Sequence, residues 1–302
     1  MTPMKRFIAV LAATLVAPAL ATVTTVSPAA AAAPANPVDA LKKQFNNGTG
    51  LRVTEISKAT SSGKTLITER LAGLYAFGAN GVTASDLTVR PSYDKSVRTG
   101  LAEEFEDDES DVDLLKLVTS PTRIIWQNKT AYVSNPALTP VLADGKTWGT
   151  ARSASHAAPL RTAYQQVNVL EPNTLKALLA DVDRKSAGGV VDGARTTLYS
   201  GVTTFGELNK VSPTFRLLHG KLSKSAAKTV LKWQLWVDGK GLPRRVVSST
   251  TEKLSRTATW REVSDTRYSG WGTRPSVKAP AAAQVDTETD IEDAFREVST
   301  TG

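Results

Sequence analysis

The stretch from Trp233 to Lys253, WQLWVDGKGLPRRVVSSTTEK, constrains the fold of this chain more than any other segment. Two runs of mostly β-forming residues flank Asp238-Gly239-Lys240-Gly241, and glycine readily adopts the positive φ angles that tight turns need. Along the first run, apolar residues occupy alternate positions and so share one face of a strand. That face carries Leu231, Trp233, Leu235 and Val237. The stretch therefore predicts a β-hairpin with one apolar face.

Runs of the same kind recur along the chain, separated by Gly, Asn, Ser and Pro. They comprise residues 51–60, 64–77, 84–91, 122–127, 130–135, 145–152, 194–204, 229–238, 242–253 and 256–272. The first three follow one another so closely that they predict a meander of antiparallel neighbours. The chain is therefore expected to be dominated by antiparallel strands.

Helical patterns are few. Asn36 and Pro37 suit the start of a short amphipathic helix that ends near residues 46–48. A second helix is predicted from Thr174 to Arg184, with Asn173 or Thr174 as its cap and the glycines at 188–189 as its end. One face of it carries Leu175, Leu178, Leu179 and Val182. Residues 205–228 are predicted to be broken helix and loop, with an interruption at Pro213. Strands and helices together predict an α+β protein.

The N-terminus has the pattern of a secretory signal peptide. Lys5 and Arg6 precede an apolar run of roughly 15 residues, shorter than a membrane span, and small residues follow up to about residue 33. We therefore expect residues 1–33 to be a signal peptide, residues 34–280 a single domain, and residues 281–302 an acidic flexible tail or a strap over the sheet. The sequence predicts an exported, soluble monomer, either secreted or associated with the cell wall, with no transmembrane segment.

Composition excludes several classes of function. The chain has no cysteine, which rules out disulfides, thiolate ligands and a lipid anchor on an N-terminal cysteine. Its net charge of +8 falls to +6 without Lys5 and Arg6 (8 − 2), and no compact basic run alternates with aromatic residues. A solvated basic surface is expected rather than nucleic-acid binding. The acidic segment 103–113 lacks the glycine and terminal glutamate of a calcium loop, so we expect an exposed loop.

The sequence offers little for catalysis. Its two histidines, His156 and His219, lie far from any recognisable acid–serine arrangement, and both are expected to be surface or hydrogen-bonding residues. Ser-x-x-Lys occurs at Ser61, Ser92 and Ser225 without the companion motifs of penicillin-binding enzymes. Dinucleotide-binding, phosphate-binding and Gly-x-Ser-x-Gly patterns are absent. We therefore expect no enzymatic activity, no metal and no cofactor.

The hairpin residues Trp236, Val237, Asp238, Gly241, Leu242, Pro243, Arg244 and Arg245 resemble a motif of the actinobacterial LppX/LprG-like lipoprotein group, within the LolA/LolB/RseB superfamily. The opening helix at residues 36–45, the hairpin at 76–89 and the closing strand at 266–280 are similar to the group as well. The resemblance implies a strongly curved antiparallel half-barrel of about ten or eleven strands, whose concave face is plugged by helices around an apolar cavity. Members of the group are mostly anchored through a cysteine, which this chain lacks.

The resemblance implies a carrier for lipids or other hydrophobic ligands in the cell envelope. The alternative is an envelope sensor or protein-interaction module of the RseB type, for which the acidic segment and acidic tail offer docking surfaces for a basic envelope protein. If a cavity is present, its expected lining is Leu175, Leu178, Leu179, Val182, Leu231, Trp233, Leu235 and Val237. The same residues also suit a plain packed core. Arg244 and Arg245 are expected to face outward into solvent rather than to bind anionic headgroups.

Overall fold

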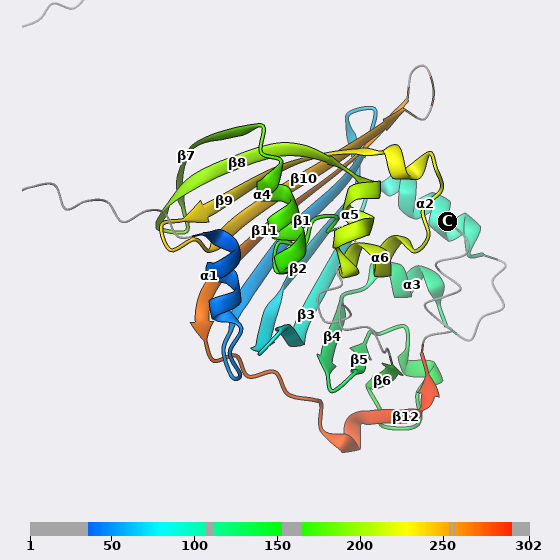
Figure 1. The fold of residues 1–302 in the computed structure, drawn as a ribbon. Helices are drawn as coiled ribbons and strands as arrows, with labels where there is room; N and C mark the ends of the chain where they lie inside the picture. Colours follow the sequence, from blue (N-terminus) through cyan, green and yellow to red (C-terminus); the bar gives the residue numbers. More distant parts are fainter. Residues whose placement is uncertain (1–35, 107–111, 153–164, 254, 256–257, 292–302) are drawn as a thin grey trace, which may run out of the picture. The chain divides into compact units, whose positions relative to one another are not determined.

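The chain forms one twelve-stranded sheet, which includes all ten predicted strands, in the computed structural model, which describes residues 36–106, 112–152, 165–253, 255 and 258–291. The described residues all belong to one compact unit. The strands are β1 (Gly50–Ser61), β2 (Lys64–Gly78), β3 (Gly81–Tyr93), β4 (Thr122–Gln127), β5 (Thr130–Ser134), β6 (Trp148–Arg152), β7 (Arg184–Val191), β8 (Ala194–Thr204), β9 (Val230–Asp238), β10 (Pro243–Lys253), β11 (Thr259–Thr273) and β12 (Val285–Asp290). Their order is β12-β6-β5-β4-β3-β2-β1-β11-β10-β9-β8-β7 (Figure 1).

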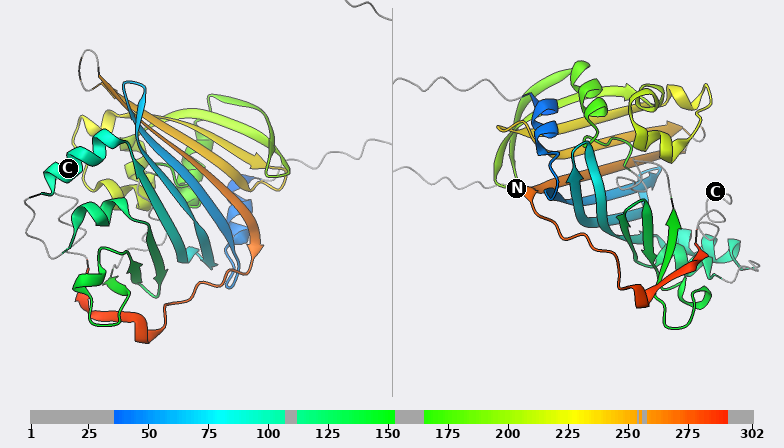
Figure 2. Two further views of the ribbon diagram at one scale, coloured as in Figure 1. Left: turned by 180° about the vertical axis from the view of Figure 1, so that it is seen from behind. Right: turned by 60° about the horizontal axis from the view of Figure 1, so that its bottom comes forward.

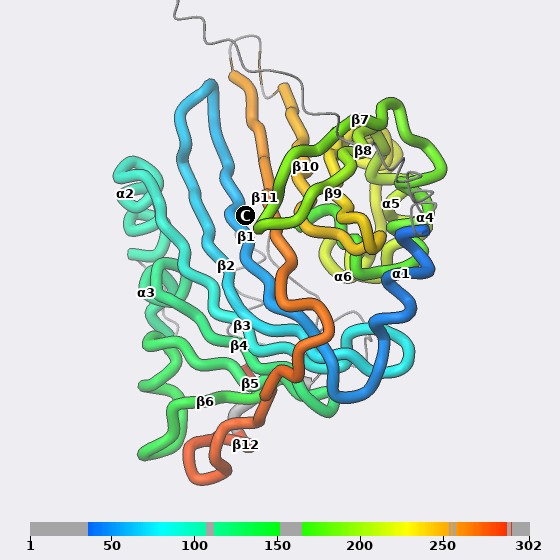
Figure 3. Tube along the Cα trace, turned by 90° about the vertical axis from the view of Figure 1, so that its left-hand side faces the viewer, coloured from blue at the N-terminus to red at the C-terminus, as the bar shows by residue number. Residues whose placement is uncertain are grey.

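The sheet is built from two antiparallel meanders that join at β1 and β11. These two long strands pair along their length, from Gly50 with Thr273 to Ser61 with Trp260. Strand β2 pairs with the other edge of β1. All neighbouring pairs are antiparallel except β12 and β6, which are parallel. The sheet curves strongly and its two ends, β12 and β7, do not pair with each other (Figures 2 and 3). The predicted α+β class and the open, curved sheet are confirmed, with twelve strands where about ten or eleven were expected.

Six α-helices accompany the sheet in the described residues. They are α1 (Pro37–Gln44), α2 (Lys95–Glu104), α3 (Leu114–Thr119), α4 (Pro172–Ala180), α5 (Phe205–Val211) and α6 (Pro213–His219). Helices α1, α4, α5 and α6 lie together on one side of the sheet, under the arch made by β7, β8 and β9 (Figure 1). Helices α2 and α3 contact β2 and β3 instead. The concave face is thus covered by helices, as the resemblance implies.

The predicted hairpin is β9 and β10, and Asp238 holds its turn. One carboxylate oxygen, Oδ1, accepts the backbone N–H groups of Lys240 (2.9 Å) and Leu242 (3.0 Å), and Oδ2 pairs with Arg244 at 2.6 Å. Gly241 has a φ of +81°, which glycine adopts without steric cost. Local turn chemistry therefore fixes this hairpin, as predicted.

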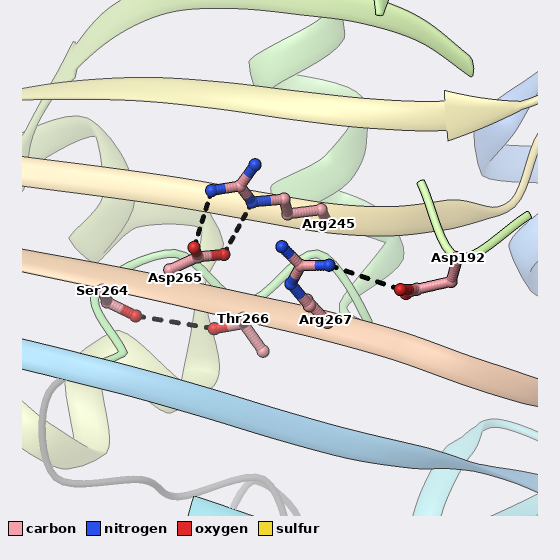
Figure 4. Close-up of polar contacts among 6 residues, drawn as sticks. All are labelled: Asp192, Arg245, Ser264, Asp265, Thr266 and Arg267. Carbon is pink, nitrogen blue, oxygen red and sulfur yellow. Dashed lines mark hydrogen bonds and ion pairs between the residues drawn. The ribbon is translucent and has the colours of Figure 1, made fainter. Parts of the chain in front are cut away.

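On the outer face of the sheet, several charged side chains of neighbouring strands and turns pair with one another. Arg245 on β10 makes two hydrogen bonds, of 2.7 and 2.6 Å, to Asp265 on β11, and its guanidinium lies 4.7 Å from the ring centre of Trp236. Arg267 pairs with Asp192 at 3.3 Å. Figure 4 shows these pairs beside Ser264 and Thr266, which come from alternate positions of β11. Arg244 and Arg245 thus contact neighbouring side chains.

Two predicted elements differ from the structure around α4. The helix predicted from Thr174 to Arg184 begins at Pro172, because a proline fits the first helical position, and Glu171 is its N-cap. It ends at Ala180, so Val182 lies beyond it. The glycines predicted to end this helix lie inside β7, where the pairing shifts between Ala187 and Gly189. A Cβ at Gly188 would lie 2.6 Å from Thr196 Oγ1, so this strand needs a glycine to approach its neighbours.

The segment predicted as a flexible tail or a strap over the sheet contains an edge strand, β12. Strand β12 pairs with β6, where Val285 is opposite Trp148, and Asp286 Oδ2 accepts the N–H of Ala143 at 2.9 Å. Ile291 is buried against Leu138 and its neighbours. Burial of these two apolar residues explains why the segment is held against the sheet. Residues 292–302 lie outside the described residues.

Candidate ligand-binding site between α4, α5 and the sheet

The main core lies between the concave face of the sheet and the helices that cover it. All eight side chains predicted to line a cavity belong to it or pack against it. Six of them are buried, namely Leu175, Leu178, Leu231, Trp233, Leu235 and Val237, while Leu179 and Val182 are partly buried. The structure therefore brings the predicted residues together. Most of them contact other side chains of the chain itself, as the packed-core interpretation expects.

Two of the predicted residues, Leu178 and Trp233, also line a pocket of about 240 Å³. Helix α4 contributes Ala177 and Leu178, and Asp181 follows as its C-cap. Strand β8 contributes Val202 and Thr203, and β9 contributes Trp233. Helix α5 completes the wall with Glu207, Leu208, Lys210 and Val211. The side chains of Leu178, Leu208 and Trp233 are buried, whereas the three charged residues are exposed. The pocket thus has an apolar floor and a charged rim.

Trp233 occupies its place because β8 has a glycine opposite it. Gly201 is the register partner of Trp233, and a Cβ there would lie 2.7 Å from Cζ2 and 3.0 Å from Cε2 of the indole. The ring edge that carries Nε1 therefore lies against Gly201. Trp233 is 1% exposed, and its Nε1 has no hydrogen-bond partner. A buried N–H without an acceptor is rare and costs about 1–3 kcal/mol.

Helices α4, α5 and α6 are tied together by the buried carboxylate of Glu171, which precedes α4. Its Oε1 accepts from the backbone N–H of Thr214 (2.8 Å) and from the hydroxyl of Thr214 (2.6 Å). Its Oε2 accepts from the hydroxyls of Ser212 (2.5 Å) and Thr174 (2.8 Å). Ser212 in turn accepts the N–H of Phe215. Because Ser212 joins α5 to α6, the three helices are linked through one side chain.

The rim of the pocket on α5 is set by a capping box. Thr204 Oγ1 accepts the N–H of Glu207, while Glu207 Oε2 accepts from the backbone N–H of Thr204 (2.8 Å) and the hydroxyl of Thr203 (3.0 Å). These hydrogen bonds, led by the one from the Thr204 backbone, lower the pKa of Glu207 below its usual range. Glu207 therefore remains ionised at the rim at neutral pH.

A buried polar cluster lies beside the apolar core, on β1, β2 and β11. Thr266 donates to Glu55 at 2.8 Å, and Gln165 Nε2 donates to both Thr266 and Tyr268 at 3.0 Å. Burial raises the pKa of Tyr268 well above its ordinary range. Burial, with the nearby charge of Glu55, also raises the pKa of Glu69 to about 7. The concave face is thus apolar under α4 and α5 and polar near β1.

A second pocket, of about 320 Å³, lies where several turns meet at one end of the sheet. Its lining is Asn47, Gly48, Ala76, Phe77, Thr83, Ala84, Gln127, Asn128, Pro275 and Val277. Gln127 accepts the N–H of Ala279 at 3.0 Å, which ties the segment before β12 to this end. None of the residues predicted to bind a ligand contributes to it.

Among the described residues, those considered for catalysis have structural contacts elsewhere in the fold. His219 at the end of α6 contacts Gln166 at 2.6 Å and lies 4.2 Å from the ring centre of Phe215, and burial lowers its pKa. His156 lies outside the described residues. Lys64, one of the Ser-x-x-Lys lysines, pairs with Asp94 at 2.6 Å. Within the described part of the chain, no group of three or more His, Asp or Glu side chains is arranged to hold a metal ion.

The residues that sequence reasoning missed are those of β8 and α5. Nothing in their local pattern shows that α5 meets α4 over Trp233, because that contact depends on how the chain returns between β8 and β9. The available signal was the capping box Thr204-x-x-Glu207, which marks the start of a helix. Nothing in the sequence indicates that Gly201 makes room for the indole.

Comparison with known proteins gives similarities of fold only. No family model and no curated protein sequence matches the chain. Among solved structures it is similar to LprF from Mycobacterium bovis, at 14% identity over 82% of this chain and 96% of that one, with a TM-score of 0.43. It is also similar to the LolA superfamily protein NE2245 from Nitrosomonas europaea, at 12% identity over 80% of this chain and 93% of that one, with a TM-score of 0.26.

At TM-scores below 0.5, neither similarity assigns a function. In the described part of the chain, no helix has both the length and the apolar character required to span a membrane.

Proposed function

We propose that this is an exported, non-enzymatic protein that binds a lipid or another hydrophobic ligand in the cell envelope. The observation that supports the proposal is the pocket between α4, α5, β8 and β9, which leads from a charged, exposed rim to a floor of Leu178, Leu208 and Trp233. An apolar floor with a few polar groups at the rim is typical of small-molecule sites. The ligand's acyl part would occupy the floor and its polar end would face the rim.

The size of the pocket predicts how such a ligand enters. Its volume of about 240 Å³ is below the roughly 300–1,000 Å³ of sites that enclose drug-sized ligands. A long acyl chain therefore fits only if the helices move away from the sheet. Leu175 and Leu178 on α4 belong to the same core as Leu231 and Leu235, so this movement would open an apolar surface for the acyl chain. Since Glu171 links α4 to α5 and α6, we expect the three helices to move together.

Lipid extraction and native mass spectrometry of protein purified from its own host test the proposal directly. We expect a co-purifying hydrophobic molecule that is released by organic solvent. Ala177→Trp, which places a large side chain in the pocket wall, should abolish binding of this molecule. Ala180→Trp is the matched control, because Ala180 is exposed on the same helix and does not line the pocket. Absence of any ligand, or equal binding by both variants, contradicts the proposal.

The alternative of an envelope sensor or interaction module rests on acidic residues at 103–113 and in the tail. Residues 107–111 and 292–302 lie outside the described residues, and Glu103 and Glu104 belong to the end of α2. No contact of the described residues favours this alternative over ligand binding. A cross-linking experiment that captures an envelope protein, and loses it when Glu103 and Glu104 are neutralised, would reverse that preference.

A further inference from the structure

We propose that the outer, convex face of the sheet docks onto the surface of a membrane that contains anionic phospholipid. The docking surface is centred on Ile56 and consists of five cationic side chains around three aliphatic ones. This inference goes beyond the proposed function, because it concerns the face of the sheet opposite the helices and does not depend on what the α4–α5 pocket binds.

The cationic side chains come from five different strands and share one face. Arg70 lies opposite both Ile56 and Arg90, and residues that lie opposite each other in a sheet point to the same side. Val263 lies opposite Lys58, and Ser249 lies opposite both Val263 and Lys232. Arg261 is two residues before Val263 and so shares its face. The five exposed cations are Lys58 on β1, Arg70 on β2, Arg90 on β3, Lys232 on β9 and Arg261 on β11.

The charge of this group is not neutralised by the described part of the chain. None of the five cations forms an ion pair there. The nearest carboxylate in the register, Asp265 opposite Ile56, is already held by two hydrogen bonds from Arg245. Asp192 is likewise paired with Arg267. The docking surface therefore presents an excess of positive charge to whatever approaches it.

The centre of the docking surface is aliphatic. Ile56 is 45% exposed, which makes it one of the few large apolar side chains that the described residues leave in solvent. Val263 and Val247, on the same face of β11 and β10, are partly exposed beside it. Aliphatic side chains ringed by Lys and Arg suit the boundary between lipid headgroups and acyl chains. Nucleic acid would instead call for open aromatic rings, and Trp236 on this face is covered by Arg245 at 4.7 Å.

The arrangement favours a membrane over other anionic or protein partners. Figure 2 (left) shows the sheet from this side, with α1, α4, α5 and α6 behind it. The cations are spread over several neighbouring strands, so they match an extended surface better than a single linear polyanion. A second copy of the chain would bring like charges face to face, which is repulsive. With the convex face on the bilayer, the helices and the pocket face away from it.

Vesicle sedimentation of protein purified from its own host tests the proposal. The protein should bind vesicles of equal parts phosphatidylglycerol and phosphatidylcholine, and should not bind phosphatidylcholine alone. Raising the salt from about 0.05 M to about 0.5 M should release most of it. Each Lys or Arg near an anionic surface contributes about a fivefold factor, so Arg70→Gln with Arg90→Gln should weaken binding about 25-fold. Both side chains are exposed and unpaired, so the variant should fold normally.

The matched control removes the same charge from the other side of the molecule. Lys42 on α1 and Lys176 on α4 are exposed on helices that cover the concave face. Lys42→Gln with Lys176→Gln should change binding by no more than about twofold. If this variant loses as much binding as Arg70→Gln with Arg90→Gln, net charge rather than the convex face is responsible. That result overturns the inference.

A fluorescent label reports the depth of contact directly. Because the chain has no cysteine, Ile56→Cys offers a single site for an environment-sensitive dye. Its emission should move to shorter wavelength when the anionic vesicles are added, whereas a dye on Lys176→Cys should not respond. If the dye at position 56 is unchanged while soluble polyphosphate binds as tightly as the vesicles, the surface is a polyanion site and the inference is overturned.

The outcomes keep this inference separate from the proposed function. Ala177→Trp, which should abolish binding in the pocket, should leave vesicle binding unchanged. If a hydrophobic ligand co-purifies but the protein ignores the charge of the vesicles, the proposed function stands and the docking surface is refuted. If the vesicles bind as described and no ligand is found, the proposed function fails and the docking surface stands.

Discussion

Substitution of Glu171 by alanine should destabilise the protein by about 3–5 kcal/mol. The side chain accepts four hydrogen bonds in a buried position, from Thr174, Ser212 and the N–H and hydroxyl of Thr214. The three hydroxyls can rotate toward other acceptors, but the buried N–H of Thr214 cannot, and an orphaned donor of this kind costs about 1–3 kcal/mol. Loss of the hydrogen bonds to a charged acceptor accounts for the remaining roughly 2 kcal/mol.

Equilibrium unfolding in guanidinium chloride measures this change. The matched control is Asp113→Ala, which removes an exposed carboxylate that caps α3 through the N–H of Lys116 and should cost only about 1 kcal/mol. Glu171→Gln, which still offers an oxygen to Thr214, should fall between the two. Hydrogen exchange should also accelerate in α4 and α6 together, because Glu171 joins them. If Glu171→Ala costs no more than Asp113→Ala, Glu171 does not link these helices in the way described.

Further predictions concern the polar cluster, the floor of the pocket and the edge strand. The pKa of Glu69 is raised from 4.5 to about 7, so the native state binds more protons than the unfolded chain between these pH values. The free energy of unfolding should therefore fall as pH rises through this window, by at most about 3 kcal/mol. Glu69→Gln should flatten that part of the pH profile of unfolding. A profile unchanged by Glu69→Gln would refute this assignment. Gly201→Ala should cost about 1–3 kcal/mol and alter Trp233 fluorescence, because its Cβ would lie 2.7 Å from the indole, and an unchanged emission spectrum would contradict the close packing. Ile291→Ala should cost about 2–5 kcal/mol by thermal unfolding, whereas a smaller loss would show that β12 contributes little to the fold.

Features set by local chemistry could be predicted from the sequence, and features set by distant contacts could not. The β9–β10 hairpin was predicted because Asp238 and Gly241 specify its turn within a few residues. Strand β7 was not predicted, because Gly188 and Gly189 were interpreted as the end of the preceding helix. In the structure, Gly188 allows close packing against Trp236, and Gly189 takes a φ of +71° at the shift in pairing.

The candidate site also combines features that one strand's sequence predicts with features that depend on distant contacts. The alternation that gave Leu231, Trp233, Leu235 and Val237 is a property of one strand, and the structure places all four in one core. The pocket itself depends on α5 meeting α4, and no local pattern encodes that contact. The unpartnered Nε1 of Trp233 depends on every neighbour of the ring and is visible only in three dimensions.

The parallel pairing of β12 with β6 bears on the order in which this chain acquires its fold. Val285 pairs with Trp148 across 137 residues of sequence (285 − 148), so β6 is synthesised long before its partner strand. Until then β6 presents an open row of backbone groups, which can pair with a strand of another chain. Strand β12 carries the exposed Glu288, and a charged side chain on an outermost strand disfavours further pairing. A chain that ended before residue 285 would therefore be expected to aggregate through β6 even if its hydrophobic core were complete.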